Sequence, residues 1–385
     1  MARLDEIFDL QMGKTPSRNN ADYWTDGQYD WVSIADLGSY QKYVEDTKER
    51  ISALAVQESG IKSVPANTVI MSFKLSLGKT AITQEPVYTN EAIMAFIPTG
   101  KYAVLPDYFY YLFSAKDWTK GTNRAVMGTT LNKATLGAVS ITVPPIDEQH
   151  KIAAVLDKVS DLIAKRQQQL DKLDEMIKAR FMEIFGEPDE NPKHWQEDEL
   201  SHHLKVIGGY AFKSDGFTDE GIPVLRIGNI NSGHFLPVNM VYWPDDLALA
   251  RYKVFPGDLV MSLTGTVGKD DYGNVCILGA DYDEYYLNQR NAKLSIEISL
   301  NKCYFSELLK FPRIKKRLTG ISRGIRQANI SNKDILTLRV PMPPIELQEQ
   351  FAAFVEQTEK TKIIISHSLE KLEPLKKALM QEYFG

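Results

Sequence analysis

The apolar residues between positions 147 and 185 predict one long helix. They recur at alternating spacings of three and four residues, with two positions of the series skipped: Leu156, Val159, Ile163, Leu170, Leu173, Ile177 and Ile184. This spacing places them on a single stripe of an α-helix, as in a coiled coil. Because no glycine or proline interrupts the segment, we expect one helix of about 38 residues, roughly 57 Å long. A helix with one apolar stripe needs a partner helix.

A second segment, residues 346–384, carries the same pattern and supplies that partner. The matching positions hold Val355, Ile365, Leu369, Leu372 and Leu379. We therefore expect the two segments to pack as a coiled coil. Pro374 lies within the second segment. Because proline removes a backbone hydrogen bond, it is expected to kink or interrupt this helix near its end.

Both helical segments belong to an internal repeat. Pro-Pro-Ile-Asp-Glu-Gln at 144–149 corresponds to Pro-Pro-Ile-Glu-Leu-Gln at 343–348, and the Phe-Gly pair at 185–186 corresponds to the pair at 384–385. Both correspondences have the same offset of 199 residues, so no gap separates them. The helices therefore open and close on the same short motifs.

The repeat extends upstream into segments that predict strands and loops. Val69-Ile70-Met71-Ser72-Phe73 resembles Leu259-Val260-Met261-Ser262-Leu263, and a Gly-Lys pair follows each, Gly78-Lys79 and Gly268-Lys269. Short β-branched and aromatic runs separated by Gly, Pro, Asn and Asp are typical of strands joined by loops. Each half is thus expected to be a mixed globular domain followed by one long helix.

These elements predict an α+β fold with two mixed α/β domains, whose long helices pack as an antiparallel coiled coil with pseudo-two-fold symmetry. Residues 186–192 are rich in helix-terminating and turn-forming residues and form the boundary between the halves. The expected divisions are residues 1–143 (first globular domain), 144–186 (first long helix), 187–342 (second globular domain) and 343–385 (second long helix).

Composition narrows the class of protein. A length of 385 residues suits two domains. The net charge of −5 argues against coating nucleic acid by bulk charge, although local basic surfaces are compatible with it. No apolar run approaches the ~20 residues that span a bilayer, and the first residues lack the apolar core of a signal peptide. Cys276 and Cys303 are the only cysteines; we interpret them as reduced thiols of a cytoplasmic protein.

No catalytic constellation is found. Gly78-Lys79-Thr80 and Gly13-Lys14-Thr15 end like phosphate-binding loops, but Phe73 and Phe8 stand where the first glycine must be. His202 and His203 are adjacent, and adjacent side chains point in different directions, which suits a metal poorly. The chain is therefore expected to be non-catalytic, with no metal or cofactor of its own.

Basic and amide side chains cluster at corresponding places in the two halves. Residues 313–333 contain seven Lys or Arg and no acid. Arginine pairs with guanine and Asn or Gln with adenine in the major groove, while Lys, Ser and Thr commonly hold phosphates. A solvated basic face is the alternative interpretation, which the duplication makes less favoured. The candidate DNA-contacting residues, including the polar loop that begins each half, are Lys14, Thr15, Ser17, Arg18, Lys79, Asn123, Arg124, Asn132, Lys213, Lys269, Arg323, Arg326, Gln327 and Asn329.

Together, the helix openings, the Phe-Gly closings, the connector from Gly186 to Trp195 and the two Val-Met-Ser-like strands resemble the specificity subunit of a type I restriction–modification enzyme. The resemblance covers essentially the whole chain. It implies that each globular domain is a target recognition domain for one half of a split DNA sequence, and that the helices set the unread spacer.

The resemblance also implies partners. Double-stranded DNA is one, and two methyltransferase subunits that modify adenine with S-adenosylmethionine are others. Two ATP-driven restriction/translocase subunits can join them, or the system can methylate only. Two alternatives differ in class: a coiled-coil adaptor whose domains bind proteins, and an unrecognised enzyme. DNA reading predicts duplex affinity that falls steeply with salt, whereas an adaptor does not bind duplex.

Overall fold

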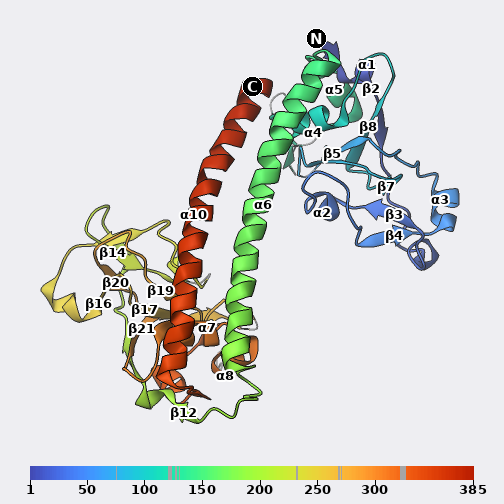
Figure 1. The fold of residues 1–385 in the computed structure, drawn as a ribbon. Helices are drawn as coiled ribbons and strands as arrows, with labels where there is room; N and C mark the ends of the chain where they lie inside the picture. Colours follow the sequence, from blue (N-terminus) through green and yellow to red (C-terminus); the bar gives the residue numbers. More distant parts are fainter. Residues whose placement is uncertain are drawn as a thin grey trace. The chain divides into compact units, whose positions relative to one another are not determined.

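The computed structural model describes residues 1–385 except 75, 120–123, 126–127, 130, 231–232, 268, 270 and 321–326; for 124, 125, 128, 129 and 327 it describes the backbone only. The chain forms two compact units. The first unit combines Met1–Gln167 with His367–Gly385, and the second unit comprises Gln168–Ser366. Each unit therefore contains part of both long helices, which are drawn in green and red in Figure 1.

In the described residues, the first unit is built from short helices, two main sheets and two short strand pairs. Its helices are α1 (Leu4–Ile7), η1 (Ala21–Tyr23), α2 (Ile34–Leu37), α3 (Ala53–Ser59), α4 (Pro106–Ala115) and α5 (Lys133–Gly137). Its strands are β1 (Ala2–Arg3), β2 (Phe8–Met12), β3 (Tyr29–Val32), β4 (Glu49–Ile51), β5 (Val69–Ser72), β6 (Thr80–Ile82), β7 (Tyr88–Thr89), β8 (Ile93–Pro98), β9 (Arg124–Ala125), β10 (Gly128–Thr129) and β11 (Ser140–Ile141). A four-stranded antiparallel sheet has the order β2-β8-β5-β6, and a three-stranded sheet has the order β4-β3-β7 with β3 and β7 parallel.

The second unit repeats this plan. Its helices are η2 (Leu200–His202), η3 (Ser214–Gly216), η4 (Ile227–Asn229), η5 (Leu247–Tyr252), α7 (Lys302–Leu308), α8 (Pro312–Thr319) and α9 (Asn332–Leu336). Its strands are β12 (Glu197–Glu199), β13 (Leu204–Gly208), β14 (Ile222–Leu225), β15 (Val241–Trp243), β16 (Lys253–Val254), β17 (Leu259–Ser262), β18 (Thr264–Thr266), β19 (Val275–Ile277), β20 (Tyr285–Leu287), β21 (Asn291–Ile296), β22 (Gln327–Asn329) and β23 (Arg339–Pro341). The sheets have the orders β13-β21-β17-β19 and β15-β14-β20-β16, with β14 and β20 parallel.

The central strands are buried on both faces, which explains why they are continuous apolar runs rather than alternating ones. Val69 and Met71 of β5 face the core shared with α4, whereas Ile70 faces the core between the two sheets. In β17, Met261 and Val260 divide in the same way. Each unit is thus layered: the sheet with the longer strands (β2-β8-β5-β6 or β13-β21-β17-β19, called the larger sheet) has helices on one face and the other, smaller sheet on its opposite face.

The long helices are α6 (Ile146–Phe185) and α10 (Ile345–Phe384), each of 40 residues. In the second unit, Phe181 lies 5.4 Å from Phe351 between ring centroids, and Asp174 lies 2.8 Å from Lys362. Because the number falls along one helix as it rises along the other, the two helices run antiparallel there. The stripe residues Leu156, Val159, Val355 and Ile365 are buried, and Ile163, Leu170, Leu173, Leu369 and Leu372 are partly buried.

The expected interruption at Pro374 was wrong, because α10 continues through it to Phe384. The physical reason lies in the packing of the last turns. Leu379, Met380 and Phe384 pack against the core of the first unit, and the ring of Phe384 meets Tyr108 at 5.5 Å. This burial offsets the one backbone hydrogen bond that proline cannot make.

A buried glutamine fixes the start of each long helix to its own globular domain. Gln149 accepts a hydrogen bond from the backbone N–H of Leu105 (2.9 Å) and donates to the carbonyl oxygens of Ala103 and Pro144 (both 2.9 Å). Gln348 accepts from the N–H of Asn301 (2.8 Å) and donates to Pro343 (2.8 Å). The last residue of each helix-opening motif is therefore a structural clamp.

Candidate nucleic-acid interface

A junction between the two sheets recurs in both units and is built from a glycine loop. In the first unit the N–H groups of Gly13 and Lys14 donate to the carbonyls of Ile93 (3.1 Å) and Thr89 (2.8 Å). In the second, Gly209 and Tyr210 donate to Asn291 (3.1 Å) and Leu287 (2.8 Å). A Cβ atom at Gly13 would lie 2.2 Å from the carbonyl oxygen of Thr89, and one at Gly209 would lie 2.2 Å from that of Asn288. Only glycine permits this close approach.

An asparagine turn completes the junction. The side-chain oxygen of Asn90 accepts from the N–H of Ala92 (2.8 Å), and that of Asn288 accepts from the N–H of Arg290 (3.2 Å). These turns follow β7 and β20, respectively, so they lie where the chain crosses from the smaller sheet to the larger one. The two junctions therefore share the same backbone plan.

The segment after the central strand ties this junction to the region around α5 or α9. In the first unit, Phe73 N–H donates to Ala92 (3.0 Å) and its carbonyl accepts from Leu131 (3.1 Å). In the second, Leu263 N–H donates to Arg290 (2.8 Å) and its carbonyl accepts from Ile330 (2.8 Å). The sequence-predicted polar loops and the segments before α5 and α9 are thus brought to one place in each unit.

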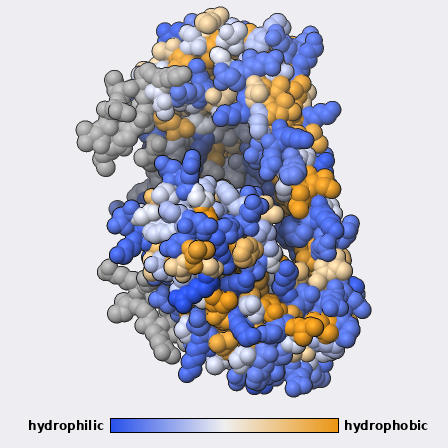
Figure 2. Space-filling model, turned by 90° about the vertical axis from the view of Figure 1, so that its left-hand side faces the viewer, coloured by the Kyte–Doolittle hydropathy of each residue, from blue (hydrophilic) through white to orange (hydrophobic). Residues whose placement is uncertain are grey.

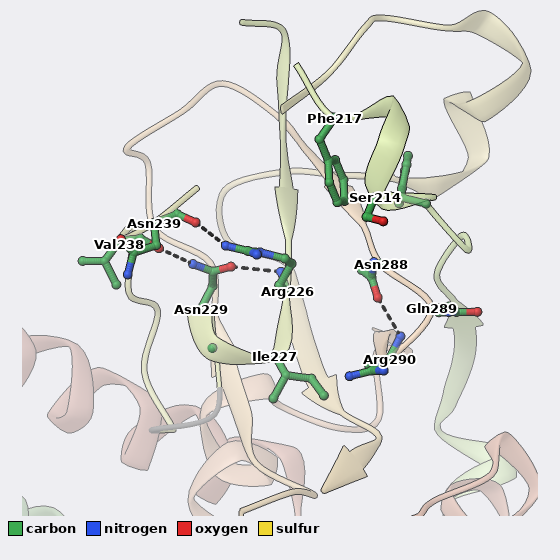
Figure 3. Close-up of a pocket in the computed structure, with 12 residues that line it drawn as sticks. Ser214, Phe217, Arg226, Ile227, Asn229, Val238, Asn239, Asn288, Gln289 and Arg290 are labelled. Carbon is green, nitrogen blue, oxygen red and sulfur yellow. Dashed lines mark hydrogen bonds between the residues drawn. The ribbon is translucent and has the colours of Figure 1, made fainter. Parts of the chain in front are cut away.

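In the second unit the junction opens into a pocket of about 480 Å³ (Figure 3). Its lining contains two arginines, several amides and no acid: Phe212, Ser214, Phe217, Arg226, Ile227, Gly228, Asn229, Val238, Asn239, Asn288, Gln289 and Arg290. Asn229 is 2% exposed and donates to the carbonyls of Leu236 and Val238, so it holds the pocket wall. The positive charge and the amides make this wall suitable for an anionic, hydrogen-bonding ligand.

In the first unit, cationic and hydroxyl groups at the equivalent junction already have partners. Arg18 forms a two-bond ion pair with Glu49, one bond of 2.9 Å, and its guanidinium lies 3.6 Å from the ring of Trp24. Thr15 donates to Glu91, and Lys14 donates to the carbonyl of Ser59. The hydrogen bond from Arg18 holds the pKa of the Glu49 carboxyl below its usual value, which keeps the pair ionised.

The sequence-predicted residues divide between these places. Lys14, Thr15, Ser17 and Arg18 lie in the first glycine loop. Lys213 is exposed in the second. Asn329 accepts a hydrogen bond from Thr264 (3.0 Å) across the β18–β22 pair, beside Leu263. Their contacts with DNA remain predictions.

Two groups of predicted residues have a different status. Asn132 is the N-cap of α5, and its side chain accepts from the N–H of Thr135 (2.8 Å), so its oxygen already serves the fold. Asn123, Arg323 and Arg326 lie outside the described residues, as do the side chains of Arg124 and Gln327.

The predicted correspondence of Gly78-Lys79 with Gly268-Lys269 was wrong. Lys79 exchanges hydrogen bonds with Ser72, its carbonyl accepting at 2.9 Å and its N–H donating to Oγ at 3.1 Å. Asn274 makes the same two bonds with Ser262, at 2.9 and 3.1 Å. Gly78 and Gly273, which precede them, both have positive φ, 83° and 69°. The equivalent pair is therefore Gly273-Asn274, because the second connection is five residues longer; Lys269 is exposed within that extra length.

Part of the basic stretch at 313–333 is also structural. Arg317 and Arg313 form ion pairs with Asp189 of the connector, at 2.7 and 3.4 Å. The hydrogen bond from Arg317 lowers the pKa of the Asp189 carboxyl. These two cations therefore join the connector to α8 and contribute less to a free basic surface than their number suggests.

The histidine pair faces one carboxylate. His202 Nδ1 and His203 Nε2 lie 2.9 and 3.1 Å from the two oxygens of Asp198. The N–H of Glu199 and then these rings lower the pKa of Asp198 to about 2. Although adjacent residues were expected to diverge, both rings reach this group. Among the residues the structure describes, no cluster of three or more His, Cys, Asp or Glu could hold a metal ion.

Sequence reasoning missed the residues that line the pocket of the second unit, above all Arg226, Gln289 and Arg290. One signal was available: the run Asn288-Gln289-Arg290 follows a buried aromatic strand directly. Two side-chain amides and a guanidinium in succession are unusual for a plain turn and match the groups that read base edges.

The outer surface shown in Figure 2 is mostly hydrophilic, with separate apolar patches. Within the described part of the chain, no helix is both long enough and apolar enough to cross a bilayer.

Comparison with known proteins identifies the family. The sequence model of the "type I restriction modification DNA specificity domain" matches residues 1–175 and again residues 192–374, so the chain belongs to this family. Its class is that of the proteins that give type I restriction–modification complexes their DNA target, and the two matches correspond to the two halves of the repeat.

Two relatives agree with this assignment, and one solved structure shares the fold. The MjaIX specificity subunit of Methanocaldococcus jannaschii is 29% identical over 66% of this chain and 62% of its own length, so that match spans less than two thirds of the relative. The MjaVIII specificity subunit of the same organism is 24% identical over 99% of this chain and 90% of its own. The crystal structure of a type I S subunit from M. genitalium shares the fold, with a TM-score of 0.60, 14% identity and coverage of 100% and 95%.

Proposed function

We propose that this chain recognises a two-part DNA sequence, one part through each sheet junction, with an unread spacer between the parts. The observation that carries the proposal is the recurrence of one backbone plan with different side chains. Gly13 and Gly209 hold equivalent loops, yet Glu91 and Ala92 stand where the second unit has Gln289 and Arg290. Two copies of one scaffold with unlike surfaces suit the reading of two unlike half-sites.

We also propose that the chain acts without catalysis of its own and binds two methyltransferase subunits, with or without restriction/translocase subunits. S-adenosylmethionine and ATP would then be bound by those partners. The family to which the chain belongs supports the proposal that it is part of such a complex. We found no catalytic constellation in the sequence, which supports the proposal that a methyltransferase subunit, and not this chain, carries out the adenine chemistry.

The decisive experiment is methylation sequencing of cells that co-express this chain with the methyltransferase of its own system. We expect adenine methylation at one gapped motif, and none when either subunit is expressed alone. Methylation at a continuous, ungapped site would contradict the two-part proposal. Methylation by the isolated, purified chain would contradict the non-catalytic one.

Duplex binding separates this proposal from the protein adaptor, which the comparisons do not support. Neutralising each phosphate contributes about −0.9 to the slope of log affinity against log salt. We therefore expect the assembled complex to bind a duplex that carries the motif with a steep negative slope. Binding that is absent, or indifferent to salt, would favour the adaptor.

A further inference from the structure

Arg290 presents an uncommitted guanidinium on a fixed backbone in the pocket of the second unit. Its N–H donates to Asn288 (3.2 Å) and its carbonyl accepts from Leu263 (2.8 Å), so the main chain is held on both sides. Its side chain is exposed and lines the pocket. Throughout the described ranges, no acceptor or acid pairs with its guanidinium. A rigid backbone that carries an unpaired fork of donors is suited to a ligand.

We propose that Arg290 determines specificity by reading a guanine, donating two hydrogen bonds to its O6 and N7. The inference rests on the proposed function and adds the base that the second unit recognises. Guanine offers two acceptors side by side at the major-groove edge, and the planar guanidinium matches them. The residues that line the pocket include no acid to compete for this fork.

The second arginine of the pocket has a different role. The Arg226 guanidinium donates to the carbonyl of Asn239, and its backbone N–H donates to Asn229 (2.9 Å). Both bonds are drawn in Figure 3: the first joins the turn after β14 to the segment that contains Asn239, and the second lies within the turn. Arg226 is therefore a positioning residue that shapes the pocket. Arg290 is the arginine of this lining that keeps its fork available.

The first unit cannot read guanine by the same means. Ala92 occupies the position of Arg290, as the shared bonds to the asparagine turn and to Phe73 or Leu263 establish. It is 5% exposed and offers no side-chain donor. Beside it, the acid Glu91 replaces Gln289. The guanine contact is therefore particular to the half-site of the second unit.

The test uses the full chain assembled with its methyltransferase subunits and a library of randomised duplexes. Wild type, Arg290→Lys and Arg290→Gln are compared by sequencing the bound DNA. Lysine keeps the charge but not the fork, so Arg290→Lys is expected to keep its affinity for duplexes that lack this guanine, while its preference for the guanine falls about 5- to 150-fold. All positions of the other half-site should be unchanged. Arg251→Lys is the matched control, because that guanidinium lies 4.5 Å from the Tyr252 ring and outside the pocket lining.

The outcomes separate the inference from the proposed function. If the wild type selects no gapped motif, the proposed function fails. If it selects one and both Arg290 variants keep every base preference, the function stands and the guanine assignment is overturned. If Arg290→Lys weakens binding to duplexes of every sequence equally and leaves the melting temperature unchanged, Arg290 contacts a phosphate, and the inference is overturned. Should Arg290→Gln misfold, the lysine variant decides alone.

Discussion

At the sheet junction of the first unit, arginine and threonine side chains face acids, whereas at that of the second unit two arginines line a pocket without acids. Arg18 is paired with Glu49 and Thr15 with Glu91, but the lining of the second pocket holds Arg226 and Arg290. The backbone bonds of the two junctions correspond one by one. Under the proposed function, recognition can therefore diverge by changing a few side chains on turns while the scaffold that positions them stays the same.

The largest effect is expected from a side chain introduced into either glycine loop. Gly13→Val and Gly209→Val each force a side chain to within 2.2 Å of a carbonyl oxygen. We expect each substitution to cost about 4 kcal/mol or more in its own unit and to abolish selectivity for one half-site only. Hydrogen exchange of each unit and selection from a randomised library would measure both effects. Loss of the same half-site in both variants would refute the equivalence of the loops.

A smaller effect is expected from the glutamine clamps. Gln149→Ala leaves three backbone groups without their partner and Gln348→Ala leaves two, and these groups are partly or fully buried in their hydrogen bonds. Because each such group costs about 1–3 kcal/mol, we expect both variants to be destabilised in denaturant unfolding, Gln149→Ala more than Gln348→Ala. Gln168→Ala, at an exposed position of α6, is the control and should change stability by less than about 0.5 kcal/mol. Equal stability of all three would show that the clamps are dispensable.

The smallest effect concerns the ion pair of the first unit. Glu49→Gln should release Arg18 at a cost of less than about 1 kcal/mol, since both side chains are substantially exposed, 48% and 40%. If the released guanidinium reaches a phosphate, the salt slope of duplex binding steepens by about 0.9. Glu85→Gln, at another exposed acid of this unit, is the control. An unchanged slope would place Arg18 away from the DNA.

The same pair predicts a pH effect of known sign. The pKa of Glu49 is lowered in the folded protein by its hydrogen bond from Arg18. Its contribution to stability is therefore fully present above the unfolded pKa and is lost as pH falls through the lowered, folded pKa. In acid unfolding, the difference between wild type and Glu49→Gln should vanish at the low-pH end. A difference that grows with acidity would contradict this assignment.

Much of the architecture could be predicted from the sequence because short motifs mark where each long helix begins and ends. The Pro-Pro-Ile openings and Phe-Gly closings set both long helices to within one residue at their starts. The pattern could not predict that α10 passes through Pro374, since that depends on Phe384 reaching Tyr108, a contact between residues 276 positions apart. Helix propensity takes account of the proline, but it does not include the contacts with distant residues that compensate for it.

The candidate site was harder to predict for a related reason. The glycine loops were found because they begin each half, but Arg290 becomes a neighbour of Gly209 only through the antiparallel pairing of β13 with β21, which places Gly208 opposite Ala292. A loop insertion also made the alignment of the two halves wrong. The counterpart of Gly78-Lys79 is Gly273-Asn274, because the loop after β17 is five residues longer than the loop after β5. Matching sequence letters cannot detect such a shift, whereas hydrogen-bond register can.

The division of the chain into units has a consequence for biosynthesis. The second unit is contiguous, Gln168–Ser366, whereas the first needs His367–Gly385 to cover the ring of Tyr108. A ribosome moving along the message therefore completes the later-encoded unit before the earlier one can close. Until the final turns of α10 emerge, apolar surface of the nascent first unit stays uncovered. We therefore expect the first unit to need chaperones for longer than the second unit does.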